Sequence, residues 1–140
     1  MDRTDIVEFS VSKLSGLIER REVSPVEVTQ AYLDRIDAVD FKFNAYLTVT
    51  RREALSAARD AEEAIGRGEY RGPMHGIPYA VKDQLWTKGI RTTGGSRILA
   101  DLVPDEDATA IANMKRAGAV MLGKANMTEF AVTGSSHQYS

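Results

Sequence analysis

Two short apolar segments with a helical pattern between them constrain the fold of this chain more than any other feature. Residues 79–81 (Tyr-Ala-Val) and 119–123 (Ala-Val-Met-Leu-Gly) have the length and character of buried strands. Between them, Asp107 precedes apolar residues at helical spacing and Gly118 follows the last of these, so we expect a helix that Asp107 caps and Gly118 ends. A strand, a crossover helix and a second strand form a βαβ unit. The pattern therefore predicts a parallel strand pair with a right-handed crossover.

The first half of the chain is expected to be mainly helical. Ser24, Pro25 and Glu27 combine a capping box with a proline at the first helical position, and apolar residues at helical spacing continue to about residue 39. A shorter helix is expected after Ser10, and an alanine-rich helix over residues 51–65.

The expected elements define an α/β fold class. A short strand is expected over residues 45–50, because this segment is rich in β-branched and aromatic residues. We expect a helical region over about residues 1–70 and a βαβ region over about residues 71–140. A parallel sheet needs both faces covered and more than two strands, so the central sheet is expected to be incomplete in this chain.

Composition excludes several kinds of functional site. The chain has no cysteine, which excludes a disulfide scaffold, a thiolate metal site and a cysteine nucleophile. Only His75 and His137 provide imidazole ligands, so we expect no metal site and no other cofactor. The formal charge of −2 argues against a broadly basic surface that binds nucleic acid. The longest apolar run, residues 119–122, is far shorter than the roughly 20 residues that span a bilayer. Residues 1–5 do not resemble a signal peptide, so we expect a cytoplasmic protein without membrane contact.

Lys82 follows the first predicted strand of the βαβ unit directly, where open α/β sheets place their active sites. If this strand is buried, the ammonium must be paired or lose its proton. Desolvation lowers the pKa of a lysine, which makes a buried lysine usable as a general base. The residues alone also allow that Lys82 is not a base, because it could pair with Asp83 or simply be exposed. Lys124, after the second strand, is a comparable candidate for the base. His75, in a Gly/Pro-rich turn, is expected at the surface or in support of the site rather than as a catalyst.

Five consecutive segments resemble the amidase signature family. They are residues 76–83 (GIPYAVKD), 87–96 (TKGIRTTGGS), 104–109 (PDEDAT), 117–124 (AGAVMLGK) and 126–131 (NMTEFA). The likeness extends over essentially the whole chain, and its motifs occur in the family's order.

The resemblance implies an α/β fold with a mixed central sheet and a Ser–cis-Ser–Lys triad. In that triad a neutral lysine takes a proton from a bridging serine, which activates a second serine to attack an amide carbonyl. Lys82 matches the family's catalytic lysine. Ala131, which follows the Glu-Phe pair, matches a residue that lines the substrate cavity; the alternative is that Phe130 and Ala131 merely pack.

The sequence departs from the family pattern at the two serines. The Gly-Gly-Ser-Ser-Gly-Gly segment that carries both is absent, and neither Gly94-Gly95-Ser96 nor Gly134-Ser135-Ser136 lies in the corresponding block. We therefore interpret residues 1–140 as the N-terminal part of a single amidase signature domain, and we expect the isolated chain to be inactive.

Three functions are compatible with these observations. The first is an amidase that cleaves a small carboxamide to acid and ammonia, and the complete protein would then act alone or as a homodimer. The second is the A subunit of the aspartyl/glutamyl-tRNA amidotransferase, which releases ammonia from glutamine for its partner subunits. Residues 92–96 and 135–140 look more like those of stand-alone amidases, which favours the first. The third, from a different class, is a non-catalytic remnant or partner-binding scaffold.

Overall fold

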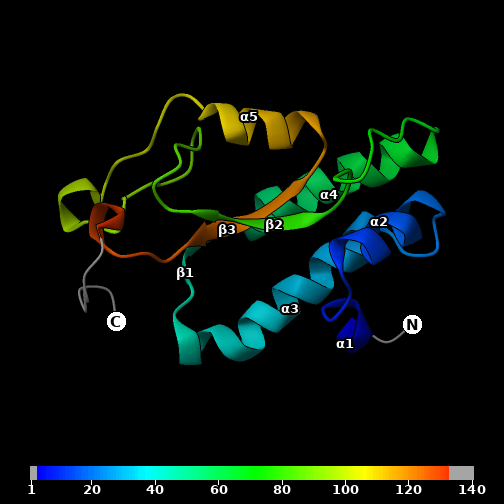
Figure 1. Cartoon of the computed structure of the whole chain (residues 1–140), viewed down its shortest axis with the longest axis horizontal. Helices are drawn as coiled ribbons and strands as arrows, with labels where there is room; N and C mark the ends of the chain where they lie inside the picture. Colours follow the sequence, from blue (N-terminus) through cyan, green and yellow to red (C-terminus); the bar gives the residue numbers. More distant parts are fainter. Residues whose placement is uncertain (1–2, 133–140) are drawn as a thin grey trace.

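The computed structural model describes residues 3–132 of the 140 (Figure 1). Helices dominate the first half of the chain, and the second half alternates short strands with loops and one helix. In chain order the elements are α1 (Arg3–Ile6), α2 (Val11–Glu19), α3 (Pro25–Phe43), β1 (Tyr46–Val49), α4 (Arg51–Gly66), β2 (Pro78–Lys82), η1 (Arg97–Leu99), α5 (Thr109–Arg116), β3 (Val120–Ala125) and η2 (Glu129–Ala131). No helix within residues 3–132 is both long and apolar enough to cross a bilayer.

The three strands form one mixed sheet in the order β1-β3-β2. β2 and β3 are parallel, as the βαβ pattern predicts, and β1 joins the other side of β3 in the antiparallel direction. In Figure 1, α5 lies above the strands and α3 below them, while α3 and α4 contact each other and β3. The α/β class with a mixed sheet, expected from the sequence, is therefore confirmed.

Local signals position the helices of the first half. Ser24 Oγ accepts a hydrogen bond from Glu27 N at 3.1 Å, and the Glu27 carboxylate accepts one from Ser24 N at 2.9 Å, so both halves of the capping box form. The helix runs to Phe43, four residues beyond the expected end at 39, and stops where Asn44 adopts a left-handed conformation with φ 50°. Ser10 caps α2 in the same manner, by accepting from Lys13 N.

Two apolar clusters hold the helices and the sheet together. Small alanines on α4 allow it to approach the sheet closely, because they bring little side-chain volume to the contact. The first cluster joins α1, α2, α3 and the end of α4, and the second joins α3 and α4 to β3. Their buried members are Ile6, Leu14, Leu17, Ile18, Val23, Val28, Ala31, Ile65 and Ile77 in the first, and Leu33, Ala54, Ala58, Val120 and Leu122 in the second.

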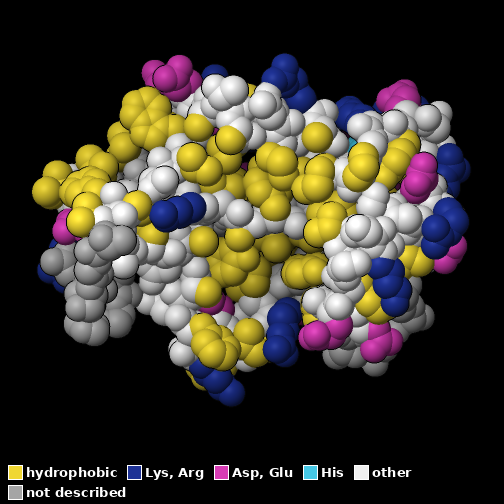
Figure 2. Space-filling model, in the orientation of Figure 1, with side chains coloured by type: hydrophobic (Ala, Val, Ile, Leu, Met, Phe, Trp, Pro, Cys, Tyr) yellow, Lys and Arg dark blue, Asp and Glu magenta, His cyan; other side chains and the backbone are white. Residues whose placement is uncertain are grey.

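The sheet leaves apolar surface uncovered. Figure 2 shows hydrophobic side chains gathered across the middle of the face seen in Figure 1, where the strands lie. Within the described part of the chain, β1 and β2 each pair along one edge only. Both features follow from a sheet of three strands, which has two free edges and a wide apolar face.

Asp107 does not cap α5, which corrects the expectation from the sequence. The helix begins at Thr109, its N-cap residue is Ala108, and no side chain caps it. The Asp107 carboxylate instead accepts a hydrogen bond from Lys88 N at 2.8 Å and pairs with Lys115 Nζ at 2.6 Å. Asp107 lies one residue too early to cap, so its carboxylate reaches the 84–96 loop and the last turn of α5.

Candidate active site

The carboxyl ends of the parallel strands β2 and β3 lie side by side and carry the charged residues of interest. Lys82, the last residue of β2, pairs in register with Ala125, the last residue of β3. The ladder continues by one bond, from Asp83 N to Ala125 O at 3.2 Å. The parallel pairing thus brings Lys82, Asp83 and Lys124 to the same edge of the sheet, where ligand sites of open α/β sheets lie.

Lys82 is exposed, which is one of the alternatives that the residues alone left open. Its neighbours Val81 and Asp83 are both buried. Successive side chains in a strand point to opposite faces, so Lys82 and Asp83 project away from each other. Lys82 forms no ion pair within residues 3–132. The alternative in which Lys82 pairs with Asp83 is therefore wrong.

Asp83 supports the end of β2 through bonds on the buried face. Its Oδ2 accepts hydrogen bonds from Thr93 N at 2.8 Å and from Thr93 Oγ1 at 2.5 Å. Its Oδ1 has no hydrogen-bond donor in the described structure but lies 3.8 Å from Lys124 Nζ. Its backbone oxygen accepts from Gly94 N at 3.0 Å. Asp83 therefore ties the strand end to the returning part of the 84–96 loop.

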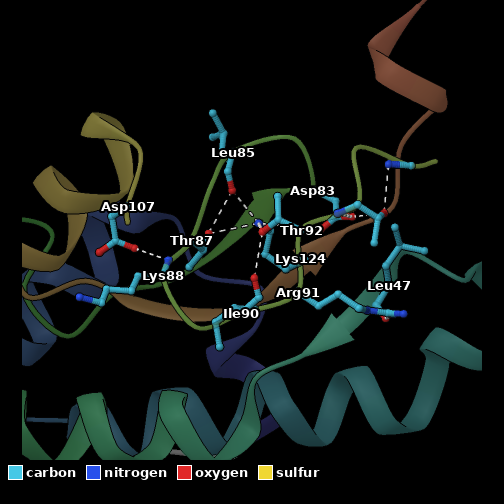
Figure 3. A network of polar contacts seen from close by, with 12 residues as sticks. Leu47, Asp83, Leu85, Thr87, Lys88, Ile90, Arg91, Thr92, Asp107 and Lys124 are labelled. Carbon is cyan, nitrogen blue, oxygen red and sulfur yellow. Dashed lines mark hydrogen bonds and ion pairs between the residues drawn. The ribbon is translucent and has the colours of Figure 1, made fainter. Parts of the chain in front are cut away.

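Lys124 is a fully buried lysine whose ammonium is surrounded by oxygen atoms (Figure 3). Its Nζ donates to Leu85 O at 2.6 Å, to Thr92 Oγ1 at 2.8 Å and to Thr87 Oγ1 at 3.1 Å. Burial lowers the pKa of Lys124 from its ordinary value of 10.5, and the neighbouring Asp83 charge opposes that shift. All three N–H groups are used in fixing the loop to β3. Lys124 thus links the 84–96 loop to β3.

A second turn connects this edge of the sheet to Ala131. Phe130 N donates to Gly94 O at 2.7 Å, and the Ser96 hydroxyl donates to Glu129 Oε1 at 2.7 Å. Two backbone bonds, through Gly94, therefore link Asp83 to the η2 turn that contains Ala131. The same contacts engage the Ser96 hydroxyl, which is buried and also accepts from Ile98 N, so the serine of the Gly94-Gly95-Ser96 segment is not available as a nucleophile.

The η2 turn is strained at the residue expected to line a substrate cavity. Phe130 and Ala131 both have positive φ, at 52° and 58°. For a residue other than glycine this conformation costs roughly 1–2 kcal/mol, and such strain is concentrated at functional sites. Phe130 is half exposed, and its ring lies next to Gly94, so the alternative that Phe130 and Ala131 merely pack stays open beside the functional one. The assignment of Ala131 to a substrate cavity stays a prediction.

His75 is buried, although a surface position was one of the two expected for it. Its Nδ1 accepts a hydrogen bond from Arg71 N at 3.1 Å, and its ring stacks on Tyr70 and lies against Gly118. Burial, with a smaller effect of the Arg71 charge, lowers the pKa of His75, which favours the neutral ring. It lies in the 71–77 turn and does not contact the Lys124 network. His137, Ser135 and Ser136 lie outside the described residues.

The buried network itself was not predicted from the sequence. Thr87, Thr92 and Thr93 are almost completely buried, and each hydroxyl contacts Lys124 or Asp83. The sequence did contain a signal for this network. A lysine inside a buried strand needs several hydrogen-bond acceptors, and the polar residues of the preceding loop can provide them. Residues 3–132 contain no group of three or more His, Asp or Glu side chains arranged to hold a metal ion.

Comparisons with known proteins agree with this geometry. The profile of the family described as Amidase matches residues 27–140. The A subunit of glutamyl-tRNA(Gln) amidotransferase from Salinispora tropica is 54% identical over 98% of this chain, and that from Moorella thermoacetica is 49% identical over 97%. The chain spans 28% of the length of each of these relatives.

Solved structures show the same arrangement of elements. The X-ray structure of native peptide amidase from Stenotrophomonas maltophilia has a TM-score of 0.83 and 35% sequence identity to this chain. The match covers 88% of this chain and 26% of the peptide amidase. The α/β arrangement described above therefore occurs within a larger structure in that protein.

Proposed function

This chain belongs to the amidase family, and we propose that residues 1–140 form the N-terminal part of an amidase domain whose base is Lys82. The observation that carries the proposal is the position of Lys82 in the matched segment and its lack of an ion-pair partner. It is the exposed lysine at the carboxyl end of β2, and it forms no ion pair with any described residue. A lysine base works as the free amine, and a carboxylate partner would favour the ammonium form instead.

The proposed reaction is hydrolysis of a carboxamide C–N bond. Lys82 takes a proton from the bridging serine of a Ser–cis-Ser–Lys triad, and the bridging serine takes one from the nucleophilic serine as that serine attacks the carbonyl carbon. The proton on Lys82 returns through the bridging serine to the nitrogen, and ammonia leaves. Water then resolves the acyl-enzyme to the free acid. Both serines would be supplied by a segment that this sequence does not contain, so the 140-residue chain is proposed to be inactive alone.

Substitution of Lys82 in the complete enzyme tests the assignment. Lys82→Ala should lower kcat/KM by about 10²- to 10⁴-fold, the usual worth of general acid–base assistance. Lys82→Arg should not restore activity, because arginine keeps the charge but cannot give up its proton. Lys42→Ala, at the end of α3, is the matched control and should leave kcat/KM unchanged. Near-wild-type turnover by Lys82→Arg would overturn the base role.

For the substrate, we propose glutamine, hydrolysed by an amidotransferase A subunit that passes ammonia to partner subunits. The identities of 54% and 49% to relatives with that name support it. Residues 92–96, which resemble stand-alone amidases, bond to Lys124, Asp83 and Glu129, so their side chains are occupied structurally. The test compares ammonia release from glutamine and from small carboxamides, with and without partner subunits. Faster release from small carboxamides without partners would favour a stand-alone amidase.

The peptide amidase likeness keeps a stand-alone amidase as the second candidate. A non-catalytic remnant or scaffold is the third candidate. Amide hydrolysis by the purified 140-residue chain does not separate it from the two enzymes, so the reading frame after Ser140 must be sequenced as well. A serine- and glycine-rich segment in that frame supports an enzyme. Its absence, with no amide hydrolysis, supports the scaffold.

A further inference from the structure

We infer that Lys124 is a positioning residue for Lys82: it holds the Asp83 carboxylate on the buried face of the sheet and so leaves Lys82 without an anionic partner. The inference rests on the base role proposed above. Lys82 and Asp83 are adjacent in the chain, and a carboxylate close to an amine favours the protonated form of that amine. A lysine base next to an aspartate therefore needs a device that engages the aspartate elsewhere.

The contacts of Asp83 show such a device. One carboxylate oxygen accepts two hydrogen bonds from Thr93, and the other faces Lys124 Nζ at 3.8 Å. Both side chains are almost completely buried, at 0% and 1% exposure for Lys124 and Asp83. The alternation along β2 directs Lys82 to the opposite face, where it is exposed. The negative charge is thus neutralised on one side of the strand while the amine stays on the other.

The charged groups on the neighbouring elements also have hydrogen-bond or ion-pair partners of their own. On the 84–96 loop, Arg91 donates to Leu47 O of β1 at 3.4 Å (Figure 3). The Asp107 carboxylate bonds to Lys88 N and Lys115 Nζ.

The two remaining elements contribute no free charge. On η2, the Glu129 carboxylate accepts from Ser96 Oγ. On β1, the register partner of Lys124 is the neutral Thr48. Asp83 is therefore the carboxylate whose release would most directly affect Lys82.

Trace acetylation of the 140-residue chain measures the effect without using catalysis. Acetic anhydride at pH 8 acylates free amines and not ammonium groups, and peptide mass spectrometry gives the rate at Lys82 relative to that at Lys42. The variants are Lys124→Met, Asp83→Asn and the double variant. Lys115→Met removes another lysine–aspartate pair, with Asp107, and is the matched control. Circular dichroism establishes that each variant is folded.

The inference predicts a specific pattern of rates. Lys124→Met should slow acetylation of Lys82 about tenfold, since the released carboxylate, at the end of its strand, can turn to the amine. Adding Asp83→Asn should restore the rate, and Asp83→Asn alone should change it less than twofold. A merely structural role of Lys124 predicts no such rescue by the second substitution. In the complete enzyme, Lys124→Met should lower kcat more than it changes KM.

Two results would overturn the inference. Faster acetylation of Lys82 in Asp83→Asn alone would mean that Asp83 is already the partner of Lys82. An unchanged rate in folded Lys124→Met would mean that Lys124 does not control that contact. If Lys124→Met does not fold, Lys124→Gln, which also removes the charge but keeps N–H donors for the loop oxygens, takes its place in the same comparison. Acetylation of Lys82 does not depend on turnover. An inactive complete enzyme would therefore refute the proposed function without changing the acetylation rates that test the role of Lys124.

Discussion

Removal of the buried Lys124 ammonium should destabilise the 140-residue chain strongly. In Lys124→Met the side chain keeps its length and most of its volume, so little cavity is left. The ammonium loses three hydrogen bonds, to Leu85 O, Thr87 Oγ1 and Thr92 Oγ1, and its contact with Asp83. Breaking one partner of a buried pair costs about 3–5 kcal/mol. The Asp83 carboxylate, released at the end of its strand, can turn toward solvent and Lys82, so we expect a loss of about 3 kcal/mol, at the lower end of that range.

Asp83→Asn should cost less, because the amide oxygen can still accept from Thr93 and Lys124 keeps its three oxygen acceptors. We expect about 1–2 kcal/mol. The double variant should be more stable than the sum of the two losses implies, by about 1 kcal/mol or more, because the second substitution removes a charge that the first left unpaired. Lys115→Met, which removes an exposed ammonium from its pair with Asp107, should cost less than about 1 kcal/mol.

Urea unfolding followed by circular dichroism measures these losses. With an m-value of about 1–3 kcal/mol/M, a loss of 3 kcal/mol moves the midpoint by about 1–3 M. Lys124→Met with the stability of Lys115→Met would refute the reasoning, since the buried ammonium would then contribute no more than an exposed one. Additive single losses would refute the coupling of Lys124 to Asp83.

The pH dependence provides a second check on the same pair. Burial lowers the pKa of Lys124 below 10.5, so the unfolded chain takes up a proton more readily than the folded chain. The Lys124 contribution to the free energy of unfolding therefore rises with pH, from the lowered folded pKa up to about 10.5. The difference in stability between wild type and Lys124→Met should grow over that range. A constant difference between pH 7 and the alkaline range would contradict the shift.

Three further substitutions test other parts of the structure by the same unfolding measurement. Gly118→Ala should cost about 3 kcal/mol or more, because φ is +77° and a Cβ would overlap the His75 ring; a loss below about 1 kcal/mol would contradict that packing. Ala131→Gly should raise stability by about 0.5 kcal/mol by relieving its positive φ, whereas Ala57→Gly within α4 should lower it by about 1 kcal/mol; equal losses would show that η2 is unstrained. Burial, aided by the Asp107 charge, raises the pKa of Tyr79 to about 12, so its contribution to stability should fall as pH rises above about 10, and Tyr79→Phe should remove that fall; an unchanged alkaline slope would contradict the shift.

Much of the secondary structure was predictable because its signals are local. The Ser24 capping box depends on residues three positions apart, and both of its hydrogen bonds form. The strand segments near residues 46–49, 78–82 and 120–125 were expected from short apolar or β-branched runs. The prediction that Asp107 caps α5 was wrong by one residue, since the N-cap residue is Ala108. An aspartate two positions before a helix can bond to a distant loop as well as to the helix start.

The sequence by itself determined the α/β class, the parallel pairing of β2 and β3, and Lys82 and Lys124 as the two candidate lysines. Only the tertiary structure shows how differently the two lysines are placed. Strand alternation exposes Lys82 and buries Asp83, and the return of the 84–96 loop surrounds Lys124 with the oxygens of Leu85, Thr87 and Thr92. These oxygens lie 32 to 39 residues from Lys124 in the chain, so no local pattern reports them. A buried charge is defined by the atoms that fold around it, and only the folded chain brings those atoms together.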